Sequence, residues 1–230
     1  SDVYKRQNQH TEVYINNKKI GEHSGGYTFF CFDITSFVHE GKNELLVAVD
    51  NSEDPNIPPL SADFTFFGGI YRDVSLISTS PIHISNTHYA SSGVYITPSS
   101  VTDEIADINI RTMLTNKEES SKKIYVEHKV FSSDGICISK TQDKVTLKVG
   151  ENQEFDTNIK IKNPSLWNTE TPYLYRLQTI LLDKDGNIID EVSNPFGIRT
   201  FSFTTNEGFV LNHKPIKFCL LYTSPSPRDC

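Results

Sequence analysis

The stretch Asp63-Phe-Thr-Phe-Phe-Gly-Gly-Ile-Tyr-Arg-Asp-Val-Ser-Leu-Ile77 decides how this sequence is interpreted. It begins with a carboxylate among aromatic residues, passes the pair Gly68-Gly69, and from Ile70 alternates as a β-strand does. Paired glycines allow positive φ angles and a close approach of other backbone segments. We therefore expect a sharp turn at the two glycines, followed by a strand over residues 70–77.

The residues before this stretch contain further strand and turn signals. Residues 12–22 predict a β-hairpin around Asn16-Asn17, because asparagine tolerates the left-handed conformations of a type I′ turn. Residues 44–50 predict a strand that is buried on one or both faces. Residues 51–60 contain three prolines and predict a surface loop that leads into Asp63.

From Pro81 onward the chain predicts a second unit made of short strands. Strand-like runs follow one another at roughly ten-residue spacing and are separated by turn signals such as Ser133-Asp134-Gly135. Each run is about half apolar at alternate positions, as an antiparallel sheet with one solvated face requires. This pattern predicts an immunoglobulin-like β-sandwich with little helix. The expected strands are residues 83–89, 106–114, 122–132, 145–149, 155–161, 173–182 and 187–192.

Composition and charge exclude several classes of protein. The chain has 230 residues, which suits one large or two ordinary domains. Its net charge of -7 argues against nucleic acid as a partner, because a phosphate backbone requires a clustered basic face. No apolar run approaches the roughly 20 residues that span a bilayer, so we expect no membrane partner.

The four cysteines are not spaced as metal ligands or as a Cys-x-x-Cys pair. We expect Cys31 and Cys137 to be buried, unpaired and structural, as free cysteines usually are. The cysteines therefore leave the redox compartment undecided.

Several stretches together resemble glycoside hydrolase family 2, which includes β-galactosidases, β-glucuronidases and β-mannosidases. The resemblance covers about residues 11–218. It rests on the Gly-Gly-Ile-Tyr-Arg-Asp-Val strand, the run of residues 21–35, the corner of residues 164–175, the exit strand Phe196-Gly197-Ile198-Arg199 and the hairpin of residues 208–217.

The hairpin departs from the family pattern at one residue. Where the family has Asn-Gly-Lys-Pro, this chain has His213 in the place of the glycine. A non-glycine residue at positive φ costs roughly 1–2 kcal/mol. Either the turn differs here, or the histidine is tolerated at that cost.

The resemblance implies an all-β fold with two sandwiches. Residues 10–80 are expected to form part of a jelly-roll-type sugar-binding β-sandwich without its N-terminal strands, and residues 81–203 an immunoglobulin-like β-sandwich. Residues 204–218 are expected to lead into a missing (β/α)8 barrel, and residues 219–230 to be a disordered or artefactual tail. Residues 1–9 depart from the family pattern, so we expect both ends to be translated adapter sequence on a gene fragment.

Asp63 is the principal candidate for a functional residue. In β-galactosidases the aspartate at the matching place contacts the terminal sugar or a bound sodium ion, and a carboxylate can serve either purpose. The alternative is a loop aspartate that caps a turn. Arg72 and Asp73 are expected to point to opposite faces of a strand. Trp167 is expected to fill the mouth of the second sandwich. The residues expected to be structural are Gly68, Gly69, Arg72, Asp73, Trp167 and Gly197.

The resemblance also implies a function for the longer parent protein. Retaining glycosidases need two carboxylates about 5–5.5 Å apart, and family 2 supplies both as glutamates from barrel strands. This sequence has no alternating strand–helix pattern, so we assign no catalytic residue and expect the fragment alone to be inactive. The expected parent hydrolyses terminal β-glycosidic bonds, with β-galactosidase as the leading specificity. The alternative is a carbohydrate-binding or adhesion module without hydrolase activity.

Further expectations follow from the same resemblance. The parent should require no cofactor, although it can bind sodium or magnesium, and its partner should be a terminal β-linked sugar. A homo-oligomeric parent and a location in the bacterial periplasm are both consistent with the family. Because the first sandwich lacks early strands, we expect it to expose apolar faces and to be the less stable unit.

Overall fold

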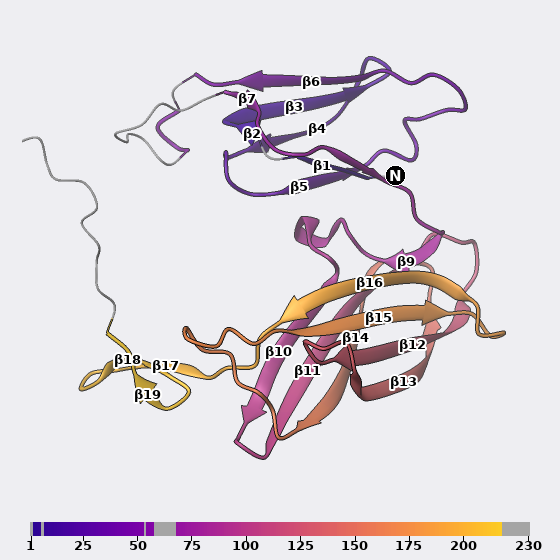
Figure 1. The fold of residues 1–230 in the computed structure, drawn as a ribbon. Helices are drawn as coiled ribbons and strands as arrows, with labels where there is room; N and C mark the ends of the chain where they lie inside the picture. Colours follow the sequence, from indigo (N-terminus) through magenta and orange to yellow (C-terminus); the bar gives the residue numbers. More distant parts are fainter. Residues whose placement is uncertain (1, 6, 53, 58–67, 218–230) are drawn as a thin grey trace, which may run out of the picture.

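The computed structural model describes residues 2–5, 7–52, 54–57 and 68–217. They form antiparallel strands arranged in two units that follow one another along the chain (Figure 1). The helical segment among these residues is one short 3-10 turn, η1 (His88–Ala90). The prediction of an all-β fold made of sandwiches is therefore confirmed. In the described part of the chain no helix has the length and apolar character needed to span a membrane.

The first unit consists of two small three-stranded sheets and one additional strand pair. The first sheet has the strand order β5 (Phe30–Asp33), β1 (Asp2–Lys5), β8 (Ser75–Ile77). The second sheet has the order β4 (Lys18–Ser24), β3 (His10–Ile15), β6 (Leu45–Asp50). The additional pair joins β2 (Gln7–Asn8) to β7 (Gly69–Ile70).

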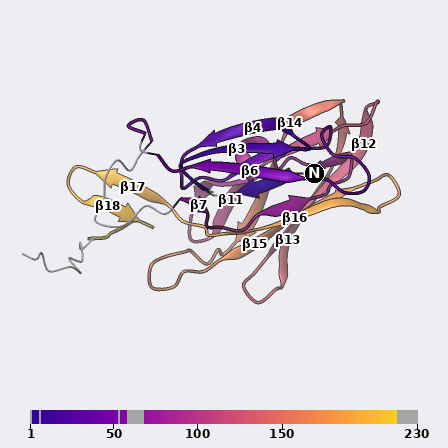
Figure 2. The same ribbon diagram turned by 90° about the horizontal axis from the view of Figure 1, so that it is seen from above.

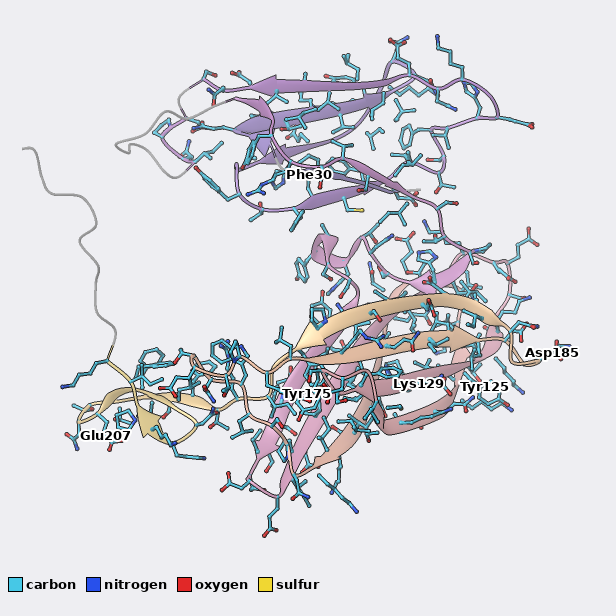
Figure 3. All side chains as sticks on the ribbon, viewed as in Figure 1. Phe30, Tyr125, Lys129, Tyr175, Asp185 and Glu207 are labelled. Carbon is cyan, nitrogen blue, oxygen red and sulfur yellow. The ribbon has the colours of Figure 1, made fainter. Side chains whose placement is uncertain are left out.

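Strand β1 lies between β5 and β8 and pairs antiparallel with both. The polar, aperiodic residues 1–9 do not predict a strand, so the central place of β1 in the sheet is visible only in the structure. A small apolar core holds the unit together: Val13, Ile15, Phe30 and Ile34 are each less than a tenth exposed. Phe30 is labelled in Figure 3.

The predicted hairpin of residues 12–22 is confirmed. Strands β3 and β4 pair up to Ile15 and Lys18, and the two residues between them, Asn16 and Asn17, have φ angles of 49° and 64°. Two successive positive φ angles are the signature of a type I′ turn, whose twist matches that of the flanking strands.

Two expectations for the first unit are wrong. The single strand expected over residues 70–77 is two short strands, β7 and β8, with residues 71–74 outside any strand. Strand β6 was expected to be buried on one or both faces, but none of its residues is buried, and Leu45 and Leu46 are 44% and 58% exposed. The strand lies at the edge of its sheet, where it pairs with β3.

The second unit is a two-layered sandwich. One layer has the order β10 (Val94–Val101), β11 (Ile105–Asn116), β14 (Gly150–Lys162), with β9 (Ile82–Ile84) also paired to β11; the other has the order β13 (Cys137–Leu147), β12 (Lys122–Phe131), β15 (Tyr175–Leu182), β16 (Ile188–Phe196). Alternate residues of both layers fill one continuous core, which includes Ile108, Ile110, Leu114, Leu177 and Leu181, each at most 1% exposed. The ring of Tyr175, labelled in Figure 3, is buried in the same core.

Strands at the start of this unit differ from the expectation. The strand expected over residues 83–89 ends at Ile84, and β10 follows η1 in a stretch for which no strand was expected. Two features hid β10 from the sequence pattern. Pro98 occupies a position beside a register shift on an edge strand, where a proline removes no essential ladder bond. Gly93, just before the strand, has a φ of 71°, and a Cβ there would lie 2.2 Å from the Ser85 carbonyl oxygen.

The other expected strands are present with shifted ends. The run of residues 145–149 is only the last part of β13, which begins at Cys137 and continues to Leu147. The thiol of Cys137 is exposed and Cys31 is half-buried, so the expectation that both are buried is wrong.

A small meander follows the second sandwich. It contains β17 (Phe201–Thr204), β18 (Gly208–Leu211) and β19 (Lys214–Pro215), and in two perpendicular views it projects from one end of the second unit (Figures 1 and 2). The turn between β18 and β19 places Asn212 and His213 at φ angles of 47° and 62°. Of the two alternatives, the structure therefore shows the second: the turn keeps its geometry and tolerates the histidine.

Candidate functional site

The principal candidate, Asp63, lies outside the described residues, as does the rest of residues 58–67. Its expected contact with a sugar or a sodium ion stays a prediction. Two segments are described: the glycine pair that follows Asp63 in the sequence, and the turn of residues 23–28, which is bonded to Tyr71 just after that pair. These segments define the candidate site.

Glycine is required at residues 68 and 69 for two different structural reasons. Gly68 approaches Asn51 so closely that an added Cβ would lie 2.7 Å from the Asn51 Cβ. Gly69 has a φ of 87° with open space around it, so it is required for its backbone conformation and not for close packing. Glycine is thus needed for close packing at residue 68 and for backbone conformation at residue 69, which lies in β7. The expected sharp turn stays a prediction, because residues 58–67 lie outside the described ones.

The turn of residues 23–28 is fastened to the segment after the glycines. The Tyr71 hydroxyl donates a hydrogen bond to the carbonyl oxygen of Gly26. The His23 ring stacks on Phe30 with 4.5 Å between centroids, and its Nε2 lies 3.1 Å from the Thr28 hydroxyl. Burial lowers the pKa of His23, so the ring is held in its neutral form near pH 7. The turn is thus a fixed part of the first unit.

Aromatic side chains are exposed at this end of the first unit. Tyr27 is 54%, Phe29 51% and Tyr71 43% exposed. Aromatic rings combine a large apolar face with a polar edge and are common at binding surfaces. This end of the first unit therefore presents aromatic rings to the solvent.

Arg72 and Asp73 follow the glycine pair directly. Both are exposed and lie between β7 and β8, outside either strand. Because neither residue lies in a strand, the expectation that Arg72 and Asp73 point to opposite faces of a strand does not apply. Their structural role stays a prediction.

Trp167 and Gly197 form a tight corner at the end of the second sandwich. An added Cβ on Gly197 would lie 3.0 Å from the Trp167 Cβ, and the guanidinium of Arg199 lies 4.7 Å from the centre of the Trp167 ring. The Trp167 backbone N–H donates to the Ile198 carbonyl at 2.8 Å. The Asn212 side chain donates to the Trp167 carbonyl at 2.9 Å. These contacts connect the sandwich to the meander.

One cluster has the residue types of a metal site. Ligand atoms of His10, Glu12 and Glu22 all lie within 4.8 Å of one another. However, the Lys19 ammonium lies 2.5 Å from Glu12 and 2.8 Å from Glu22. Hydrogen bonds from Lys19 and Tyr14 lower the pKa of Glu12, and the bond from Lys19 lowers that of Glu22. The lysine thus supplies the positive charge, and the cluster is an ion-pair network.

Two buried titratable residues on β12, Glu127 and His128, were not expected from the sequence. Glu127 is bound by Lys129 and Lys140, and His128 is fully buried with its Nδ1 3.0 Å from the Thr179 hydroxyl. No motif marks them. His128 is on the same face of β12 as the core residues Val126 and Val130, and Glu127 is on the opposite face, where it pairs with Lys129 and Lys140. Both belong to the second sandwich, whereas the glycine pair belongs to the first unit.

Comparison with known proteins supports both units. The model of "Glycosyl hydrolases family 2, sugar binding domain" matches residues 3–81, and that of "Glycosyl hydrolases family 2" matches residues 83–199. The chain is 40% identical to a β-glucuronidase of Bacteroides fragilis over 90% of this chain and 30% of that protein. It is 34% identical to the β-galactosidase BoGH2A of Bacteroides ovatus over 90% of this chain and 23% of that protein.

Solved structures agree with the sequence comparison. The crystal structure of Bacteroides uniformis β-glucuronidase superposes with a TM-score of 0.87 at 36% identity, covering 94% of this chain and 26% of that one. The chain thus spans less than a third of the length of these relatives. The family models together cover nearly all of the two units described above. The chain belongs to glycosyl hydrolases family 2.

Proposed function

We propose that this chain forms the two N-terminal sandwiches of a longer hydrolase that cleaves terminal β-glycosidic bonds. The observation that carries the proposal is the match of the family models to both units in succession, residues 3–81 and 83–199. Membership in a hydrolase family supports a sugar as the substrate. The relatives' greater length supports a further catalytic part beyond these units.

The proposed mechanism places bond cleavage in the part of the parent that follows residue 217. A retaining glycosidase uses one carboxylate as the nucleophile and a second, about 5–5.5 Å away, as the acid and then the base. Carboxylates in the described sandwiches have other tasks. Glu12 and Glu22 share the ammonium of Lys19, and Asp183 accepts backbone N–H groups of its own turn at 2.8 Å. The sandwiches therefore serve as scaffold and binding surface, and this chain alone should be inactive.

Two sugars compete as the substrate of the parent. The sequence signature favoured a β-galactoside. The relatives named β-glucuronidase, including the one at 40% identity, favour a β-glucuronide. The two differ in the orientation of the C4 hydroxyl and at C6, where the glucuronide carries a carboxylate that a binding site recognises with a cationic or hydrogen-bonding partner. Asp63 would be placed better for neutral hydroxyl groups than for that carboxylate, so we retain the galactoside as the first choice.

The proposal is tested with two proteins. Purified residues 1–230 and the full product of the gene are assayed with nitrophenyl β-galactoside and nitrophenyl β-glucuronide. We expect no turnover by residues 1–230, and turnover of the galactoside by the full protein. Turnover by residues 1–230 at enzymic rates would refute the division of tasks. Preference of the full protein for the glucuronide would refute only the choice of sugar.

A further inference from the structure

Lys117 lies at the junction of the two units, directly after the end of β11. Its ammonium forms an ion pair with Asp33, the last residue of β5 in the first unit. It also lies 3.2 Å from a carboxylate oxygen of Glu151 on β14, in its own unit. One positive charge is thus shared between carboxylates from the two sandwiches. Lys117 and Asp33, which pair across the junction, are 84 positions apart in the sequence.

Both ends of this ion pair are held in place by local hydrogen bonds. The second oxygen of Asp33 accepts from the backbone N–H of Thr35 at 2.9 Å and from its hydroxyl at 2.6 Å. The Lys117 backbone N–H donates to the Pro81 carbonyl at 3.0 Å, where the second unit begins. The charged groups are therefore presented by fixed turns, which reduces the side-chain entropy lost on pairing.

The electrostatics agree with a formed ion pair. Burial by itself would raise the pKa of Asp33, but hydrogen bonds from Lys117 and Thr35 outweigh it and lower the pKa well below its usual range. Burial would lower the pKa of Lys117, but the bonds to Asp33 and Glu151 raise it. Both groups are about one-third exposed, so salt should weaken their attraction.

The surroundings of this ion pair are polar. A cavity of about 410 Å³ lies beside it, and Asp33, Thr35, His83, Lys117 and Glu151 are among the residues that line it. Domains that meet through a small polar interface move relative to each other by default. A fixed orientation of the two units therefore needs specific polar contacts.

The linker of residues 78–80 is fastened on one side. The Ser80 hydroxyl donates to the Ile189 carbonyl at 3.2 Å, and His83 Nδ1 lies 2.8 Å from the Ser80 carbonyl oxygen. These bonds attach the end of the linker to the second unit. Residues 78–79 lie between this attachment and the end of β8 at Ile77.

We propose that Lys117 is an interdomain latch, a positioning residue that fixes the orientation of the first sandwich on the second by pairing with Asp33. Glu151 steadies the ammonium from its own side. With the latch open, the first unit would pivot at residues 78–79 while each sandwich stays folded. The inference concerns the geometry of this chain and does not depend on the identity of the sugar.

The test measures residual dipolar couplings of residues 1–230 and fits an alignment tensor to each unit separately. For the wild type at low salt we expect one common tensor. Lys117→Met removes the charge, so we expect two tensors of different magnitude and direction, and 0.5 M NaCl should move the wild type toward that state. Lys117→Arg should restore the common tensor. The matched control is Lys122→Met, because Lys122 pairs with Glu118 within the second unit at 2.6 Å.

Either of two results would overturn the latch: a common tensor in Lys117→Met, or an equal loss of the common tensor in Lys122→Met. The couplings of each unit must still fit that unit's own fold, which separates pivoting from unfolding. Should Lys117→Met not fold, Asp33→Asn tests the same ion pair from the first unit, with the same two outcomes.

Discussion

The Trp167 side chain lies directly against the backbone of Gly197, so that a Cβ added to the glycine would meet three side-chain atoms of the tryptophan at 3.0–3.1 Å. Gly197 does not have a positive φ, so glycine is required here because of this contact and not because of its backbone conformation. Side-chain atoms on Gly197 would push the indole away from the corner between the sandwich and the meander. The pair therefore acts as one structural element.

Gly197→Ala should destabilise the second unit by about 1–3 kcal/mol, the usual cost of overpacking. The measurement is urea unfolding followed by tryptophan fluorescence, since Trp167 is the single tryptophan of the chain. Ser202→Ala, at an exposed position of β17, is the control and should change stability by less than about 0.5 kcal/mol. A neutral Gly197→Ala would show that the indole yields without cost.

His128 should make the second unit sensitive to acid. Burial lowers its pKa to about 4, although the charge of Asp143 acts in the opposite direction. The unfolded chain takes up a proton near pH 6.5 and the folded chain only near pH 4, so stability falls as the pH decreases through this window. The loss should reach roughly 2–3 kcal/mol at pH 4.5.

The histidine's share is isolated by comparison with His128→Phe, whose ring fits beside the parallel ring of Phe155. Unfolding free energies of both proteins are measured at pH 7.0 and pH 4.5. We expect the decrease between the two pH values to be smaller in the variant by most of that amount. An equal decrease in both proteins would assign the acid sensitivity to other groups.

Glu127 should be important for stability although it is one of many acidic residues on the strands. Its side chain is 6% exposed, and it binds Lys129 at 2.5 Å and also Lys140 (Lys129 is labelled in Figure 3). Glu127→Gln removes the charge that both ammonium groups share. We expect a loss of about 1–3 kcal/mol in urea unfolding, because a largely buried partner is lost. Glu118→Gln, in a more exposed pair with Lys122, should cost less than about 1 kcal/mol. Equal costs would contradict the role of burial.

His213→Gly should stabilise the meander by up to about 1 kcal/mol. The histidine holds a φ of 62°, which glycine adopts without the steric cost, although glycine also gains entropy in the unfolded chain. Hydrogen exchange of the β18 amides measures the effect locally. Lys214→Gly, at a neighbouring strand position, should do the reverse. If both variants shift exchange in the same direction, the strain at His213 is not the cause.

The first unit should be digested before the second. Leu46 and Leu76 are 58% and 69% exposed, and the buried cluster of the first unit is far smaller than that of the second. Limited proteolysis with mass spectrometry should yield a resistant product that begins near Pro81. A resistant product from the N-terminal third instead would show that the first unit is the more stable one.

Features that depend on neighbouring residues could be predicted from the sequence. The turn at Asn16-Asn17 is set by the φ preference of asparagine, and the long strands of the second unit follow from alternating polarity. Edge strands were predicted less well: Pro98 concealed β10, because the cost of a proline depends on which side of the strand is paired.

Short motifs and the period of the side chains were sufficient for the family, the all-β class and the turn at Asn16-Asn17. Three features became visible only in the folded chain: the need for glycine at residue 197, the burial of His128 and Glu127, and the pairing of Lys117 with Asp33 across the junction. Each of these depends on atoms brought together from distant parts of the chain, and a linear pattern contains no record of such distances.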